Sequence, residues 1–254
     1  MQVSIPSSGG VTLEGYLAVP DVPGPTGLPG VVISHGFPDG PGGGSNSPQS
    51  YPQLADRIAD EMGWVVVVPF LRGMQASTGD FSLVGWRNDI VSAAKYCSEQ
   101  ERVNAVWLVG FGTAGALSIA AGTIDSSVRG VASLAAPADF SDWANAPDKL
   151  LTHARNCGAI KTPGYPEDPE SWERALSEIS AVQAAEDLAP TNLMLMHGSA
   201  DEVVPQFDAR AIADAHGTAD LRIVQGAGHY LRFDPRSVAI LLGWLDRQRR
   251  QVAV

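Results

Sequence analysis

Short apolar runs, most of them bounded by glycine or proline, recur along the chain and predict β-strands. After the first run, most of them alternate with segments of helical periodicity. Leu54, Ile58 and Met62 recur at four-residue spacing after Pro52, and residues 235–249 carry one apolar stripe. Strands rich in β-branched residues that alternate with helices predict an α/β fold with a doubly wound, mostly parallel sheet. The predicted strands are residues 11–19, 30–36, 64–69, 105–110, 128–136, 192–198 and 221–226.

The alternation stops at residues 137–187, which contain aromatic residues and prolines but no strand pattern. This segment directly follows a predicted strand, so we expect it at the carboxyl edge of the sheet, where ligands bind in doubly wound folds. It is therefore interpreted as a small helical lid within a single domain spanning residues 1–254. The glycine-rich residues 37–49 are too polar for a regular element and predict a mobile loop on the same rim.

Composition and charge narrow the class of protein. A chain of 254 residues, 44% of them hydrophobic, can form one large core, although length alone would also allow two small domains. A net charge of -11 repels phosphate backbones and anionic lipids, so neither nucleic acid nor membrane is an expected partner. The sequence shows no signal-peptide pattern and no apolar run of membrane length, which predicts a cytoplasmic protein. The oligomeric state stays open.

The two cysteines, Cys97 and Cys157, belong to no C-x-x-C pair and no Cys/His cluster. This spacing argues against a disulfide framework and against structural zinc. Both thiols are expected to be packing residues. No metal and no organic cofactor is expected.

The segment VWLVGFGTAGALSIA, residues 106–120, runs from an apolar strand through a glycine turn into a helix pattern. Hydrolases place their nucleophile in such a turn, as the serine of a G-x-S-x-G motif. Here Gly112 stands at the serine position, and Ala114 stands where the last glycine is usual. Because glycine has no side chain, Gly112 cannot form an acyl intermediate, and ordinary serine-esterase activity should be absent or very weak.

Four segments together resemble the α/β-hydrolase superfamily, in the style of its dienelactone-hydrolase and peptidase-like esterase branches. They are VVISHGF, GFGTAG, MHGSADEVVP and GAGHYL, and the resemblance covers nearly the whole chain. It implies an α/β-hydrolase fold. It also implies that Asp201 is the acid, that His229 is the general base, and that the backbone N–H groups of Phe37 and Thr113 are the oxyanion donors.

Simpler local interpretations accompany these assignments. Asp201 could cap the helix that follows it, and His229 could be an ordinary loop histidine. His35 and His197 are expected to brace loops by hydrogen bonds. The hydroxyl of Thr113 is a poor substitute for the missing serine, because a shift of one residue should point it away from the base.

Several functions remain compatible with the sequence. The favoured one is a divergent hydrolase for a small ester, lactone or related carbonyl compound, in which His229 and Asp201 activate water directly. The same dyad could abstract a proton from the substrate, as in a lyase or isomerase. Alternatively, the protein is a non-catalytic ligand-binding module, or Gly112 is an engineered replacement in an ordinary serine esterase. In each case the expected partner is a small molecule, in a pocket walled by Phe37, Phe140, Trp143 and Tyr230.

Overall fold

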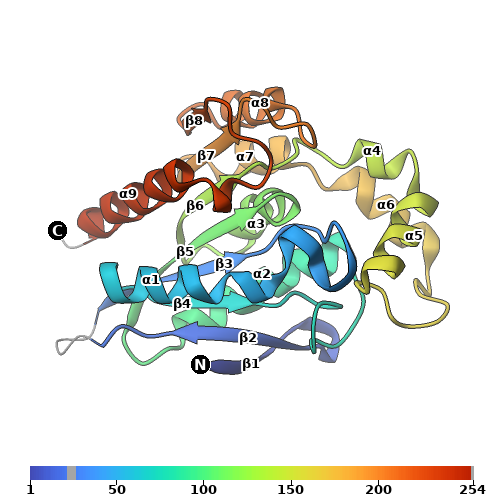
Figure 1. Cartoon of the computed structure of the whole chain (residues 1–254), viewed down its shortest axis with the longest axis horizontal. Coiled ribbons are helices and arrows are strands. Elements are labelled where there is room, and N and C mark those ends of the chain that lie inside the picture. The colour runs from blue at the N-terminus through green and yellow to red at the C-terminus, as the bar shows by residue number, and fades with distance from the viewer. Residues whose placement is uncertain (22–26, 253–254) are drawn as a thin grey trace.

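One mixed sheet organises the part of the chain that this computed structural model describes, residues 1–21 and 27–252 (Figure 1). Its eight strands lie in the order β1-β2-β4-β3-β5-β6-β7-β8. β1, β2 and β4 pair antiparallel, and β4, β3, β5, β6, β7 and β8 pair parallel. The strands are β1 (Gln2–Pro6), β2 (Thr12–Ala18), β3 (Leu28–Ser34), β4 (Val65–Pro69), β5 (Val103–Phe111), β6 (Val128–Leu134), β7 (Asn192–Gly198) and β8 (Asp220–Val224).

Every apolar run that predicted a strand forms one, so the mostly parallel sheet is confirmed. The sequence pattern missed β1, because it is a short edge strand in which only Ile5 is buried. Strands at the centre are apolar on both faces for a structural reason. In β4, Val65 and Val67 pack into the core on one face of the sheet, and Val66 and Val68 pack into the core on the other.

Helices cover both faces of the sheet. Residues of α2, α3, α7 and α8 share one core with the sheet, and residues of α1 and α9 share the other. The fold is therefore doubly wound, as predicted. The helices are α1 (Pro52–Met62), α2 (Leu83–Ser98), α3 (Thr113–Ile124), α4 (Ser141–Ala144), α5 (Pro147–Cys157), α6 (Pro169–Glu178), α7 (Ala181–Leu188), α8 (Gln206–His216) and α9 (Pro235–Val252).

Residues 137–187 form four of these helices, and they divide into two groups. α4, α5 and α6 lie together beyond the end of the sheet, on the right of Figure 1. α7 packs between α3 and α8 and so belongs to the layer that covers the sheet. Only α4 to α6 stand where a lid would be.

Residues 37–49 form a loop that helps to line the cavity described below, and the loop has some local structure. They contain two short 3-10 turns, Pro41–Asn46 and the start of Pro48–Ser50. Asn46 is buried, and its side-chain amide donates a 2.8 Å hydrogen bond to the carbonyl of Phe37. The segment contains no regular helix, since Gly42, Gly43 and Gly44 have non-helical backbone angles, but hydrogen bonds fold it back on itself.

No helix of the described residues combines the length and the apolarity needed to cross a membrane.

Candidate active site

The glycine turn after β5 has the predicted strand–turn–helix geometry. β5 ends at Phe111, α3 begins at Thr113, and Gly112 between them has φ 54° and ψ −125°. The N–H of Gly112 donates a 2.8 Å hydrogen bond to the carbonyl of Leu134, which ties the turn to β6. This left-handed conformation is the strained one that a nucleophile occupies at an elbow, and here glycine adopts it without strain.

Close backbone packing explains the two glycines that flank the turn. A Cβ on Gly110 would lie 2.2 Å from the carbonyl oxygen of Ala114, and one on Gly115 would lie 2.9 Å from Oγ of Ser133. Gly112 is different, because a Cβ there would meet no atom closer than 3.5 Å. The elbow therefore retains room for a side chain that the sequence does not provide.

The imidazole ring of His229 faces this space. Its Nε2 lies 3.5 Å from the Cβ position of Gly112. Its Nδ1 lies 2.9 Å from Oδ2 of Asp201, so the structure brings the two residues together as the resemblance implied. Since Nδ1–H donates to the carboxylate, the neutral ring leaves Nε2 as a hydrogen-bond acceptor toward the elbow.

The carboxylate of Asp201 is fully buried and held by several donors. Its Oδ1 accepts hydrogen bonds of 2.9 Å from the N–H groups of Val203 and Val204. Burial alone would raise the pKa of Asp201, but hydrogen bonds from His197, His229 and the Val204 amide hold it well below its usual range. Asp201 is thus ionised at neutral pH. It does not cap α8, which begins at Gln206, so the simpler interpretation was wrong.

Two further histidines are braces, as expected. His197 is buried, and its Nε2 lies 2.9 Å from the carbonyl of Val204 and 3.2 Å from the Asp201 carboxylate. His35 is also buried. Its Nδ1 donates to the carbonyl of Gly36 at 2.9 Å, and its Nε2 accepts from the N–H of Leu71 at 3.1 Å.

The two expected oxyanion donors flank the elbow. Thr113 begins α3, where backbone amides carry the positive end of the helix dipole. The segment that leads to Phe37 lies against the elbow, since the Cα of Gly36 is 3.7 Å from the Cβ position of Gly112. Within the residues that the structure describes, neither the Phe37 nor the Thr113 amide donates to a protein acceptor. Both are free to bind an oxygen.

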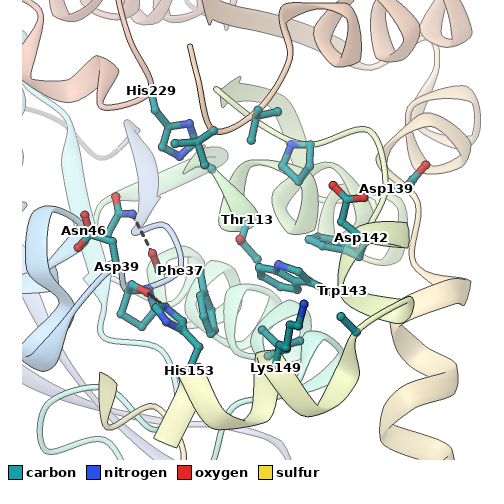
Figure 2. A pocket seen from close by; sticks show the side chains of 18 of the residues that line it. Phe37, Asp39, Asn46, Thr113, Asp139, Asp142, Trp143, Lys149, His153 and His229 are labelled. Atoms are coloured by element: carbon teal, nitrogen blue, oxygen red, sulfur yellow. Dashed lines mark hydrogen bonds between the residues drawn. The ribbon is translucent and has the colours of Figure 1, made fainter. Parts of the chain in front are cut away.

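A cavity of about 510 Å3 opens in front of these groups (Figure 2). It is lined by Gly112, Thr113 and His229 on the side of the sheet and by α4 and α5 opposite. The hydroxyl of Thr113 was expected to point away from the base, and it forms no hydrogen bond with His229 in the described structure, although Thr113 lines the cavity. The residues expected as walls also line it, namely Phe37, Phe140, Trp143 and Tyr230.

Other residues of the cavity could not be inferred from the sequence. Asp39, Asn46, Asp142, Lys149 and His153 all line it. They come from loops and short helices whose polar residues look like ordinary surface residues. The i, i+4 spacing of Lys149 and His153 places both on one face of α5, but nothing in the sequence says which face meets the cavity.

A second histidine contacts a thiol at the edge of the cavity. Nε2 of His153 lies 2.9 Å from the carbonyl of Pro38 and 3.4 Å from Sγ of Cys157. Because Nε2 must carry its proton to bind the Pro38 carbonyl, it cannot also remove the thiol proton. Burial, together with the charge of Asp39, raises the pKa of Cys157. Cys157 is therefore a packing residue and no replacement nucleophile, and Cys97 is buried as well.

The loop that carries His229 is tied to the loop that follows Phe37. The Tyr230 hydroxyl donates a 2.5 Å hydrogen bond to Asp39, and the Arg232 guanidinium donates to Ser45 and Ser50. The same guanidinium lies 4.5 Å from the centre of the Tyr51 ring. These contacts hold the His229 loop against the segment that follows Phe37. In the described residues, no group of three His, Cys, Asp or Glu side chains could hold a metal ion.

Comparison with known proteins identifies the fold. No protein-family model matches the sequence, and no curated protein matches it significantly. Solved structures match over nearly the full length. The α/β hydrolase GrgF from Penicillium sp. sh18 is 20% identical with a TM-score of 0.76, covering 100% of this chain and 99% of that one. Est1E from Butyrivibrio proteoclasticus, solved with ferulic acid bound, is 17% identical with a TM-score of 0.72, covering 99% of each chain.

A third similar structure is XC6422 from Xanthomonas campestris, described as an α/β serine hydrolase without a lid. It is 19% identical with a TM-score of 0.64, covering 99% of this chain and 94% of that one. At these identities the likeness concerns the fold. The chain has the α/β-hydrolase fold, with an eight-stranded, mostly parallel sheet flanked by helices.

Proposed function

We propose that this protein is a divergent hydrolase for a small ester, lactone or related carbonyl compound, and that His229 activates water without a covalent acyl intermediate. The observation that carries the proposal is the position of Nε2 of His229. It faces the empty side-chain position of Gly112 at 3.5 Å, while Nδ1 is held by the Asp201 carboxylate at 2.9 Å. A base so oriented is positioned for proton transfer at the elbow.

The space beside Gly112 suits a water molecule. A serine side chain would fill it, and one water occupies about 30 Å3 of liquid volume. A water at that point could donate a hydrogen bond to Nε2 of His229 while its oxygen faces a carbonyl carbon in the cavity. Water, which is itself a substrate of hydrolysis, thereby takes the place of the missing serine.

The reaction then needs only groups already present. The water oxygen bonds to the carbonyl carbon as Nε2 takes a proton, and the former carbonyl oxygen becomes an oxyanion held by the amides of Phe37 and Thr113. The imidazolium is stabilised by ionised Asp201. When the bond to the leaving oxygen breaks, Nε2 returns the proton to that oxygen. The products are an acid and an alcohol, and the histidine ends neutral.

The rate by this route should be low. In subtilisin, loss of the nucleophilic serine reduces turnover about a millionfold, while binding and the oxyanion hole retain about 10³–10⁴ over the reaction in water. Direct attack by water can recover only part of the difference. The similar structures GrgF and XC6422, which are named hydrolases, support the reaction class and say nothing of the rate.

The test compares three substitutions, with p-nitrophenyl acetate as the assay ester. Gly112→Ser should raise the rate at least ~10²-fold, because it supplies the one missing group to an otherwise complete frame. Gly112→Ala is the matched control. It fills the water position but adds no hydroxyl, so it should lower the rate of the starting protein.

His229→Ala decides whether the starting protein is an enzyme at all. If His229 activates water, the low rate of the starting protein should fall to the uncatalysed rate in His229→Ala. If the starting rate does not depend on His229, and folded Gly112→Ser shows no turnover on a panel of esters and lactones, the proposal fails. A non-catalytic ligand-binding function would then be the better explanation.

A further inference from the structure

Lys149 is the one lysine or arginine among the described residues that line the cavity. Its ammonium has no carboxylate within ion-pair distance in the described structure. The other charges nearby are carboxylates. Asp39 is engaged by Tyr230 and by the N–H of Ser45, whereas Asp142 makes no hydrogen bond to a described residue. A cation is thus left unpaired in the cavity of a protein whose net charge is -11.

The place of Lys149 on its helix is also unfavourable without a ligand. It is the third residue of α5, in the first turn, where the helix dipole favours anions and disfavours cations. Its i, i+4 neighbour is His153, which is bound to the Pro38 carbonyl and offers no negative charge. The Lys149 side chain is exposed at the edge of the cavity, where water solvates its charge in the absence of a ligand.

A second free donor lies on the same wall. The indole N–H of Trp143 donates no hydrogen bond to a described residue, and Figure 2 shows the Lys149 amine extended toward Trp143. The Trp143 ring is fixed by contacts with Phe37 and Phe140, at centroid distances of 5.0 and 5.3 Å. A flat apolar wall therefore carries an ammonium and an N–H donor across the cavity from His229.

We propose that Lys149 and Trp143 form a subsite for a carboxylate carried by the substrate, at the end of a flat apolar body opposite the reacting carbonyl. This inference rests on the proposed function, because the substrate's carbonyl oxygen occupies the oxyanion site. The favoured substrates are hemiesters and other carbonyl compounds with a second, anionic end. Asp139 and Asp142 also line the cavity, so the attraction of Lys149 and the Trp143 N–H for the carboxylate must exceed their repulsion.

The experiment measures binding, so that it does not depend on turnover. 4-Acetylbenzoate is a ketone that cannot be hydrolysed and carries a carboxylate across its ring, and 4-acetylbenzamide is nearly the same shape without the charge. Isothermal titration at low salt should show about three- to tenfold tighter binding of the benzoate, the range expected for a partly exposed, charge-assisted contact. The preference should shrink at high salt.

Variants locate the preference. Lys149→Met should remove it, Lys149→Arg should retain it, and Trp143→Phe should weaken it by removing the N–H. Lys95→Met is the matched control, since Lys95 is an exposed lysine of α2 paired with Glu99 and should leave both affinities unchanged. Equal affinities in the starting protein, tighter binding of the benzamide, binding of neither ketone, or a preference that survives Lys149→Met would each overturn the subsite. If only the proposal that His229 activates water is wrong, the predicted affinities for the two ketones stay the same.

Discussion

The buried side chain of His35 should make the stability of the fold depend on pH. It stands directly after β3, fully buried, and braces the segment that carries the Phe37 amide. Its unprotonated Nε2 accepts the N–H of Leu71, so protonation would break that hydrogen bond and bury a charge. Burial lowers the pKa of His35 to about 4, although the hydrogen bond to Gly36 opposes the shift.

The sign follows from the two pKa values. In the unfolded chain His35 has a pKa near 6.5 and binds a proton as pH falls, whereas the folded protein excludes that proton until about pH 4. Below pH 6.5 the unfolded state therefore binds more protons, and folding loses stability. Integration over this window gives a loss of about 2 kcal/mol between pH 7 and pH 5 from this one residue.

The assay is urea unfolding at pH 7 and pH 5, for the starting protein and for His35→Gln. A glutamine side chain can accept from Leu71 and donate to Gly36, but it does not titrate. The variant should lose less stability than the starting protein over this pH range, by about 2 kcal/mol. If the two proteins lose the same free energy of unfolding, His35 is not the acid-sensitive brace that its contacts indicate.

Two further predictions concern the elbow. A fluorophosphonate probe, which reacts with an activated serine, should leave the protein unlabelled by intact-mass spectrometry. Stoichiometric labelling in the cavity would show a missed nucleophile, and Thr113 would be the first residue to replace. In thermal unfolding, Gly110→Ala should lower the melting temperature more than Gly112→Ala. The former puts a Cβ 2.2 Å from a carbonyl oxygen, whereas the latter mainly incurs backbone strain of about 1–3 kcal/mol. Equal shifts would contradict the packing described for the elbow.

Much of the fold was predictable because central parallel strands must be apolar on both faces. The same physics explains the failure at β1, where one buried residue, Ile5, leaves hardly any pattern to detect. The local turns within residues 37–49 could not be predicted, because they depend on hydrogen bonds such as that of Asn46 with Phe37. Such contacts form between positions that no periodicity connects.

Within the candidate site, too, some residues could be inferred from the sequence and others could not. His229, Asp201 and Gly112 stand in motifs with fixed local geometry, so their places could be inferred before the structure was known. Lys149 could not be found in this way. It reaches the cavity only because short helices beyond the sheet happen to turn one face toward it. Residues that determine which substrate binds are thus harder to infer than those placed at strand ends.

The glycine at the elbow also affects how much folded protein a cell can keep. Glycine adopts φ 54° without the strain of about 1–3 kcal/mol that a larger residue would carry there. The greater entropy of an unfolded glycine offsets about 0.5–1 kcal/mol of this gain. A net difference of up to about 2.5 kcal/mol changes the ratio of folded to unfolded chains by a factor of up to about 70. Since cellular proteases remove unfolded chains, a chain with glycine at position 112 should be longer-lived than one with a larger residue there.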